Sequence, residues 1–129
     1  MNKEDINKPT SAELEILQIL WMAGPSSVRF VNDELNKKKK TGYTTTLKLM
    51  QIMLEKNLLE RDEDSKVHIY HTLVQKEDIQ GKLLDRFLES TFSGSAHNLV
   101  MQVLGNHKPN AAELKEIREL INRLESKDD

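Results

Sequence analysis

TTTLKLMQIMLEK, residues 44–56, is the most informative segment of this chain. At about 100° per residue, its bulky side chains fall on one broad arc of a helix. That arc holds Thr46, Leu47, Leu49, Met50, Met53 and Leu54. The opposite strip holds Thr44, Lys48, Gln51 and Glu55, flanked by Thr45 and Ile52. The spacing therefore predicts a helix with one core-facing side and one side of hydroxyl, amide and charged groups.

Two helices are predicted before this segment and two strands after it. Thr10 and Glu13 have the spacing of a capping box, which begins the first helix, and Gly24-Pro25 ends it. The second helix covers about residues 28–36, and the strands cover 58–61 and 67–73. Three helices followed by a hairpin is the order of a winged helix-turn-helix, whose third helix enters the major groove of DNA.

The second half of the chain is predicted to be helical throughout. An apolar stripe follows residue 75, a short helix closes at Gly105, and Asn110 with Glu113 forms a box-like cap before the last helix. The predicted fold is mainly α with a small β-hairpin wing. It comprises a winged helix-turn-helix DNA-binding domain over residues 1–74 and a three-helix C-terminal dimerisation domain over residues 75–129.

The composition excludes several classes of protein. The 129 residues include no cysteine, which rules out disulfides, thiolate catalysis and cysteine-based metal sites. No apolar run approaches the roughly 18 residues that cross a bilayer, and residues 1–5 lack the apolar core of a signal peptide. We therefore expect a cytoplasmic protein without direct membrane insertion. A net charge of −2 argues against a strongly basic nucleic-acid coat, although a local basic surface remains compatible with it.

No catalytic or metal-binding motif is present in the sequence. It contains no G-x-S-x-G turn, no glycine-rich phosphate loop and no H-E-x-x-H, and its four histidines lack ligand spacing. The paired carboxylates Glu13 and Glu15 are attributed to capping and to solvation on a helix surface. We therefore expect no enzyme activity, no cofactor and no metal.

The candidate DNA contacts lie on and beside the third helix. The side chains predicted to face bases are Thr44, Thr45, Lys48 and Gln51. The side chains predicted to contact phosphates are Lys38, Lys40, Arg61 and Lys66. Each assignment has an alternative, because a polar helix face is often only solvated and a lysine run is often an exposed loop. The acidic residues 62–64 at the hairpin tip would also repel phosphate.

The second half is predicted to need a partner, because three short helices cannot bury their apolar stripes alone. The predicted dimer contacts are Ile79, Leu83, Phe87, Leu99, Ile117, Ile121 and Leu124. The alternative is that these helices pack back on the first domain in a monomer. A two-fold dimer would present two recognition helices and read a pseudo-palindromic site.

Several segments resemble the BlaI/MecI penicillinase-repressor family, which also includes the CopY copper repressors. Residues 10–21 resemble its opening helix, 28–35 its second helix, and 43–47 the start of its recognition helix. The other similar segments are 58–61 and 68–70 in its wing, and 87–88, 92–95 and 99–100 in its dimerisation segment. The resemblance implies a dimeric repressor bound to double-stranded operator DNA. In antibiotic-responsive members it also implies a membrane sensor protease that detects a cell-wall antibiotic and cleaves the repressor.

The sequence departs from the family pattern at several places. Gln102-Val103 stands where antibiotic-responsive members have an Asn–Phe cleavage bond, so it marks the candidate cleavage region and leaves release by proteolysis open. Ile52 replaces an arginine of the recognition helix, and Ser65-Lys66 replaces a Gly-Arg turn of the wing. The absence of cysteine excludes the mechanism of the copper branch.

The features together predict a homodimeric transcriptional repressor that needs no cofactor. The alternative is a winged-helix adaptor that binds other proteins and does not bind DNA. The near-neutral first domain and the acidic hairpin tip favour that alternative.

Overall fold

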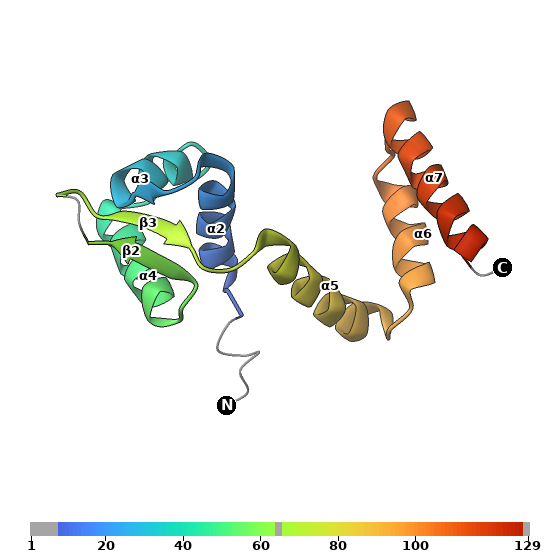
Figure 1. The fold of residues 1–129 in the computed structure, drawn as a ribbon, viewed down its shortest axis with the longest axis horizontal. Coiled ribbons are helices and arrows are strands. Elements are labelled where there is room, and N and C mark those ends of the chain that lie inside the picture. The colour runs from blue at the N-terminus through green and yellow to red at the C-terminus, as the bar shows by residue number, and fades with distance from the viewer. Residues whose placement is uncertain (1–7, 64–65, 128–129) are drawn as a thin grey trace. The chain divides into compact units, whose positions relative to one another are not determined.

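The computed structural model describes residues 8–63 and 66–127, which divide into two compact units, Met1–Lys82 and Leu83–Asp129. The described residues form six helices and a three-stranded antiparallel sheet (Figure 1). The predicted fold class, mainly α with a small wing of strands, is confirmed. The domain boundary between residues 74 and 75 stays a prediction. Residues 1–5, Asp64 and Ser65, which enter the predictions above, lie outside the described residues.

Helix α2, Ser11–Ala23, begins at the predicted capping box. The Thr10 hydroxyl accepts the Glu13 N–H at 3.2 Å, and the Glu13 carboxylate accepts the Thr10 N–H at 2.8 Å. The helix ends at Gly24, whose φ of 84° lies in the left-handed region that glycine adopts without strain. The buried apolar side chains of α2 are Ile16, Leu17 and Leu20.

A short strand and two helices follow α2. Strand β1, Ser26–Ser27, has no sequence signal, because two residues are too few to show alternation. Ser27 also caps helix α3, Val28–Asn36, since its hydroxyl accepts the Phe30 N–H at 3.1 Å. The bounds of α3 are those predicted. Helix α4, Tyr43–Glu55, is the predicted third helix and begins one residue earlier than expected.

Strands β2, Leu59–Asp62, and β3, Ile69–Thr72, form the predicted hairpin, and β1 pairs with the other edge of β3. In this register Tyr70 lies opposite Arg61 of β2. Tyr70 is 1% exposed, whereas its neighbours in β3, Ile69 and His71, are half-buried. Strand β3 therefore turns its aromatic side chain toward the core of the first unit.

The core of the first unit is built from α2, α3, α4 and the sheet. Helix α4 contributes the fully buried Met50 and Met53, and the chain leaves this helix through Asn57, whose φ is 62°. The Trp21 ring N–H donates to the Val74 carbonyl at 3.2 Å, which ties α2 to the segment after the sheet. The buried apolar cluster consists of Ile16, Leu17, Leu20, Val28, Val31, Met50, Met53, Leu58, Leu59 and Tyr70.

Three further helices complete the described chain. They are α5, Lys76–Phe92, α6, Ala96–Asn106, and α7, Ala111–Lys127. The predicted cap before α7 is confirmed, because Asn110 and Glu113 exchange both side-chain-to-backbone hydrogen bonds. The predicted stop at Gly105 is wrong: α6 continues past it and is capped by His107, since a glycine near a helix end costs only about 1 kcal/mol. None of the described helices is both long and apolar enough to span a membrane.

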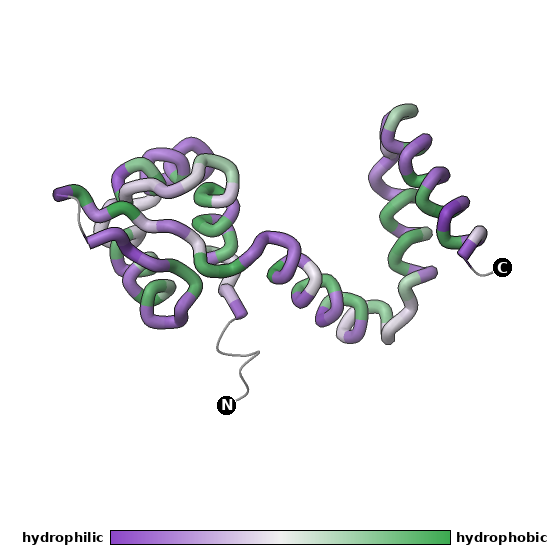
Figure 2. Tube along the Cα trace, in the orientation of Figure 1, coloured by the Kyte–Doolittle hydropathy of each residue, from purple (hydrophilic) through white to green (hydrophobic). Residues whose placement is uncertain are grey.

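The second unit has no closed core within one chain. None of the described residues from 83 to 127 is buried. Hydrophobic residues nevertheless recur along α6 and α7, as Figure 2 shows in green. In the described part of this unit, the large apolar side chains left 45% or more exposed are Leu84, Phe87, Val100, Met101, Val103, Leu120, Ile121 and Leu124.

Candidate nucleic-acid interface

The outer face of α4 carries the side chains predicted to meet bases. Thr44, Thr45, Lys48 and Gln51 are all exposed. On the opposite face, Thr46, Met50 and Met53 are each 0% exposed. The division between the two faces follows the predicted pattern, and contact of the four outer side chains with bases stays a prediction.

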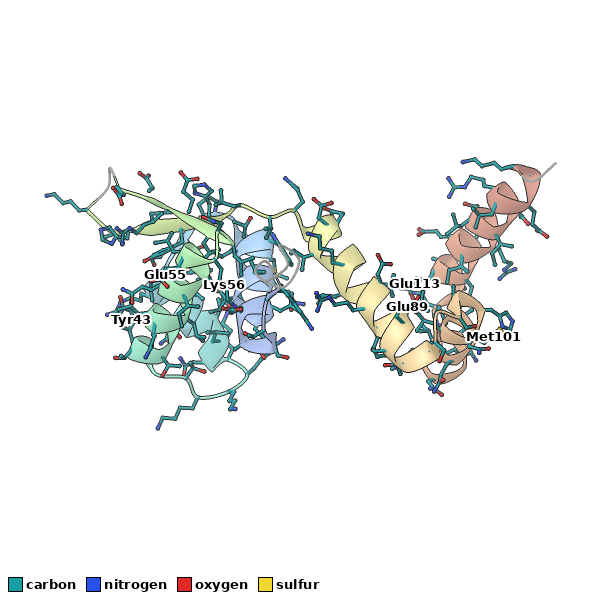
Figure 3. All side chains as sticks on the ribbon, turned by 90° about the horizontal axis from the view of Figure 1, so that it is seen from below. Tyr43, Glu55, Lys56, Glu89, Met101 and Glu113 are labelled. Atoms are coloured by element: carbon teal, nitrogen blue, oxygen red, sulfur yellow. The ribbon has the colours of Figure 1, made fainter. Side chains whose placement is uncertain are left out.

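The N-terminal end of α4 has no side-chain cap. Gly42 is the N-cap residue, and within the described part of the chain no side-chain cap bond reaches the first turn. Tyr43 begins the helix at this end and is 47% exposed (Figure 3). Free N–H groups and the helix dipole make such an end favourable for anions.

The lysine run forms the turn between α3 and α4. Lys37 is paired with Glu34 at 2.9 Å, and its own side chain is 70% exposed. Lys38 and Lys40 are exposed, and neither forms an ion pair within residues 8–63 and 66–127. Lys38 and Lys40, which are predicted to contact phosphates, therefore lie just before α4. None of the described side chains forms an ion pair with them.

The wing offers less free positive charge than the sequence indicates. Arg61 Nη2 lies 3.2 Å from the Glu63 carboxylate. Hydrogen bonds to Glu63 and Tyr70 raise the pKa of Arg61 above its ordinary value. A phosphate at Arg61 would therefore compete with Glu63, while Lys66 is exposed.

An ion pair anchors the C-terminal end of α4 to α2. Lys56 Nζ donates to Glu13 Oε1 at 2.8 Å, and Lys56 lies at the end of α4 away from Tyr43 (Figure 3). The Glu13 side chain is 2% exposed and the Lys56 side chain 29%. The capping role of Glu13 is confirmed, but its assignment to a solvated helix surface is wrong, because Lys56 and the first turn of α2 enclose it. No local pattern signals this pair, whose members are 43 positions apart.

The side chains predicted to form the dimer contact differ in exposure. Ile79 is 2% exposed and belongs to the first unit, so the single chain already covers it. Phe87, Ile121 and Leu124 are between 47% and 56% exposed. The half-buried members are Leu83, Leu99 and Ile117. Phe87 also packs edge-to-face against Phe92, with ring centroids 5.6 Å apart.

The first unit has the features of a winged helix-turn-helix protein. Its three helices precede a hairpin, the third helix exposes a polar face, and a lysine turn lies directly before that helix. Residues 9–123 match the sequence profile of a family described as "Penicillinase repressor". The chain belongs to this family, which is one of transcriptional repressors and not of enzymes.

Three relatives indicate how far the similarity extends. The methicillin resistance regulatory protein MecI of Staphylococcus aureus is 26% identical over 114 residues, covering 88% of this chain and 93% of the relative. The penicillinase repressor of Staphylococcus aureus is 24% identical over 116 residues, covering 90% and 92%. The transcriptional regulator BlaI of Mycobacterium tuberculosis is 24% identical over 116 residues, covering 88% and 83%.

Proposed function

We propose that this chain is a homodimeric transcriptional repressor that binds a pseudo-palindromic operator through α4. The observation that carries the proposal is the outer face of α4, where exposed hydroxyl, amide and ammonium groups can bond base edges. The lysine turn and the uncapped first turn of α4 lie directly beside that face and suit phosphates. Membership in a repressor family supports the same function.

Homodimerisation is supported by the uncovered apolar side chains of the second unit. A second copy would remove Phe87, Ile121 and Leu124 from water, and each fully buried side chain of this size contributes about 1.5–3 kcal/mol. In a two-fold dimer, two copies of α4 would reach successive major grooves about 34–36 Å apart. The paired sites would make binding far tighter than one copy alone achieves.

Loss of the dimer would release the operator. Relatives are named for methicillin resistance and for penicillinase repression, and we propose a role in antibiotic resistance with a membrane sensor protease as partner. Gln102 and Val103 are exposed within α6. A protease needs extended backbone, so α6 would have to open locally before cleavage. Within one chain this opening costs little packing, because α6 has no buried residue, but in the proposed dimer it would also cost the contacts of Leu99.

Replacing Lys48 by alanine is expected to weaken operator binding by about 1–3 kcal/mol and to relax the preference at one base position. The reason is that a lysine on the outer face of α4 can read the acceptor edge of guanine. The operator would first be selected from random oligonucleotides. Gel shifts with that operator and its single-base variants then measure the preference, and an equal loss on every duplex would contradict base contact.

Replacing Lys40 by alanine is expected to weaken binding to all duplexes by a similar factor. A phosphate contact carries no sequence information, and losing it lowers the slope of log affinity against log salt by about one. Binding titrations at several salt concentrations measure the slope. Lys108→Ala, which removes an exposed lysine from the second unit, is the matched control and should leave the slope unchanged. An unaltered slope in Lys40→Ala would refute the assignment.

A second candidate function is that of a winged-helix adaptor which binds proteins and not DNA. The pairing of Arg61 with Glu63 favours it, because the wing then presents little free positive charge to a phosphate. Duplex binding at low salt that disappears at high salt would favour the repressor. Failure to bind any duplex at low salt would favour the adaptor.

A further inference from the structure

We propose that Asn36 is a positioning residue for DNA binding, because its carboxamide closes the lysine turn and joins it to the network that holds α4. The inference rests on the proposed function, since it concerns how the chain presents positive charge to a duplex. Asn36 itself is the last residue of α3 and precedes the four lysines.

The Asn36 carboxamide pairs with both backbone groups of Thr41. Its Oδ1 accepts the Thr41 N–H at 2.9 Å, and its Nδ2 donates to the Thr41 carbonyl at 2.8 Å. Nδ2 also donates to the Asn32 carbonyl, one helical turn earlier, at 2.7 Å. The end of α3 is thereby joined to the residue that follows Lys40, which closes the turn at its base.

Other hydrogen bonds fix the backbone inside the turn. The N–H groups of Lys38 and Lys39 donate to the Leu35 carbonyl at 3.2 Å and 3.1 Å. The Thr41 hydroxyl donates to the Lys39 carbonyl at 2.9 Å. The side chains of Lys38, Lys39 and Lys40 are exposed and form no ion pair with the described residues, whereas Lys37 is paired with Glu34, so a fixed backbone carries three neighbouring unpaired positive charges. Such charges repel one another, and a phosphate placed among them would relieve that repulsion.

Asn32 links the same turn to α4. The Asn32 carboxamide is oriented so that Nδ2 faces hydrogen-bond acceptors and Oδ1 faces a donor. In this orientation Asn32 Nδ2 lies 3.2 Å from the carbonyl oxygens of Thr41 and Gly42. It also donates to Thr46 Oγ1 at 2.7 Å, and Asn32 Oδ1 lies 3.2 Å from Asn36 Nδ2, whose two hydrogens already bond the Asn32 and Thr41 carbonyls. Thr46 is 0% exposed on the inner face of α4. The asparagine network, formed by Asn32, Asn36, Thr41 and Thr46, therefore connects the lysine turn to the helix that faces the bases.

A fixed turn should favour duplex binding because little further ordering is needed when phosphates are bound. Without the Asn36 carboxamide, the Thr41 N–H and carbonyl lose the partner that joins them to α3, and the turn must be ordered again on binding. Ordering the equivalent of one backbone residue on binding lowers the affinity by a factor of about 5 to 30. The loss should appear on any duplex, since phosphate contacts do not depend on sequence.

The test uses the full chain with a mixed-sequence DNA duplex as probe. Asn36→Ala is expected to bind this duplex about 5-fold to 30-fold more weakly than the unmodified chain at about 100 mM salt. Thr10→Ala is the matched control, because it removes a hydrogen-bonded cap of the first unit away from the lysine turn at a comparable cost in stability. Binding is measured below the thermal transition of both variants, and the control should keep the affinity of the unmodified chain.

A double-mutant cycle separates positioning from general destabilisation. Replacing Lys38 and Lys40 by alanine lowers the affinity by some factor in each background. If Asn36 acts through the lysine turn, this factor should be at least two times smaller in the Asn36→Ala chain than in the unmodified chain. Additive losses would overturn the proposal, as would a folded Asn36→Ala chain of unchanged affinity. Should Asn36→Ala not fold, Thr41→Ala takes its place, because it removes only the hydroxyl bond to the Lys39 carbonyl. This variant should bind the duplex about twofold more weakly, and the same cycle with Lys38 and Lys40 is then measured in it. If the unmodified chain binds no duplex, the proposed function fails first, and the inference falls with it.

Discussion

Replacing Lys56 by methionine is expected to lower the free energy of unfolding of the first unit by about 3 kcal/mol. The substitution leaves the Glu13 carboxylate, which is 2% exposed, with the Thr10 N–H as its one remaining bonded partner among the described residues. A buried charge that loses its counter-ion costs about 3–5 kcal/mol, and the lower end of that range applies because the Lys56 side chain is 29% exposed. Urea unfolding followed by the fluorescence of Trp21, the one tryptophan of the chain, measures the change in the unit that contains the pair.

A substitution of the other member of the ion pair supplies the control. Glu13→Gln keeps an oxygen that can accept the Thr10 N–H, and Lys56 can then turn toward water, so we expect a loss of only about 1 kcal/mol. The double variant should recover most of the stability lost by Lys56→Met, because no unpaired buried charge remains. A Lys56→Met chain as stable as Glu13→Gln would contradict this account of the pair.

Replacing Phe87 by glutamate is expected to convert the proposed dimer to a monomer at micromolar concentration and to weaken operator binding at least about a hundredfold. Phe87 is 49% exposed in the single chain, in a unit without any buried residue among those described. A second copy would cover this ring, and a charged carboxylate in its place would be forced out of water. Sedimentation measures the oligomeric state, and titration of the selected operator measures affinity.

Met22→Glu is the matched control for this experiment. Met22 is 90% exposed on α2, in the first unit, and the substitution adds the same single negative charge. The control should sediment as the unmodified chain does. A Phe87→Glu chain that also sediments unchanged would show that α5 is not part of the dimer contact.

Local sequence signals predicted most of the fold of the first unit. The capping box at Thr10 and the two faces of α4 depend on residues within one or two helical turns, so spacing alone reveals them. The burial of Glu13 could not be predicted, because its partner Lys56 follows a different helix. Strand β1 could not be predicted either, since its two serines become a strand only by pairing with β3.

The candidate site was predictable to a smaller extent. The exposed positions of α4 follow from periodicity, but the loss of free charge at Arg61 depends on how Glu63 folds back beside it. The burial of Ile79 within the single chain was also not predicted, because its spacing only continues the apolar stripe of α5. The hydrogen bonds of Asn32 and Asn36 carry no recognisable motif, because their acceptors are chiefly backbone carbonyls of a turn.

The order of strands in the small sheet affects how the protein resists aggregation. Strand β2 lies at one edge of the sheet, and three consecutive side chains on it, Glu60, Arg61 and Asp62, are ionic. Charged side chains on an edge strand discourage the addition of a foreign strand, because a growing sheet would have to desolvate them. The β2 edge of the wing can therefore lie at the surface with little tendency to accept a further strand.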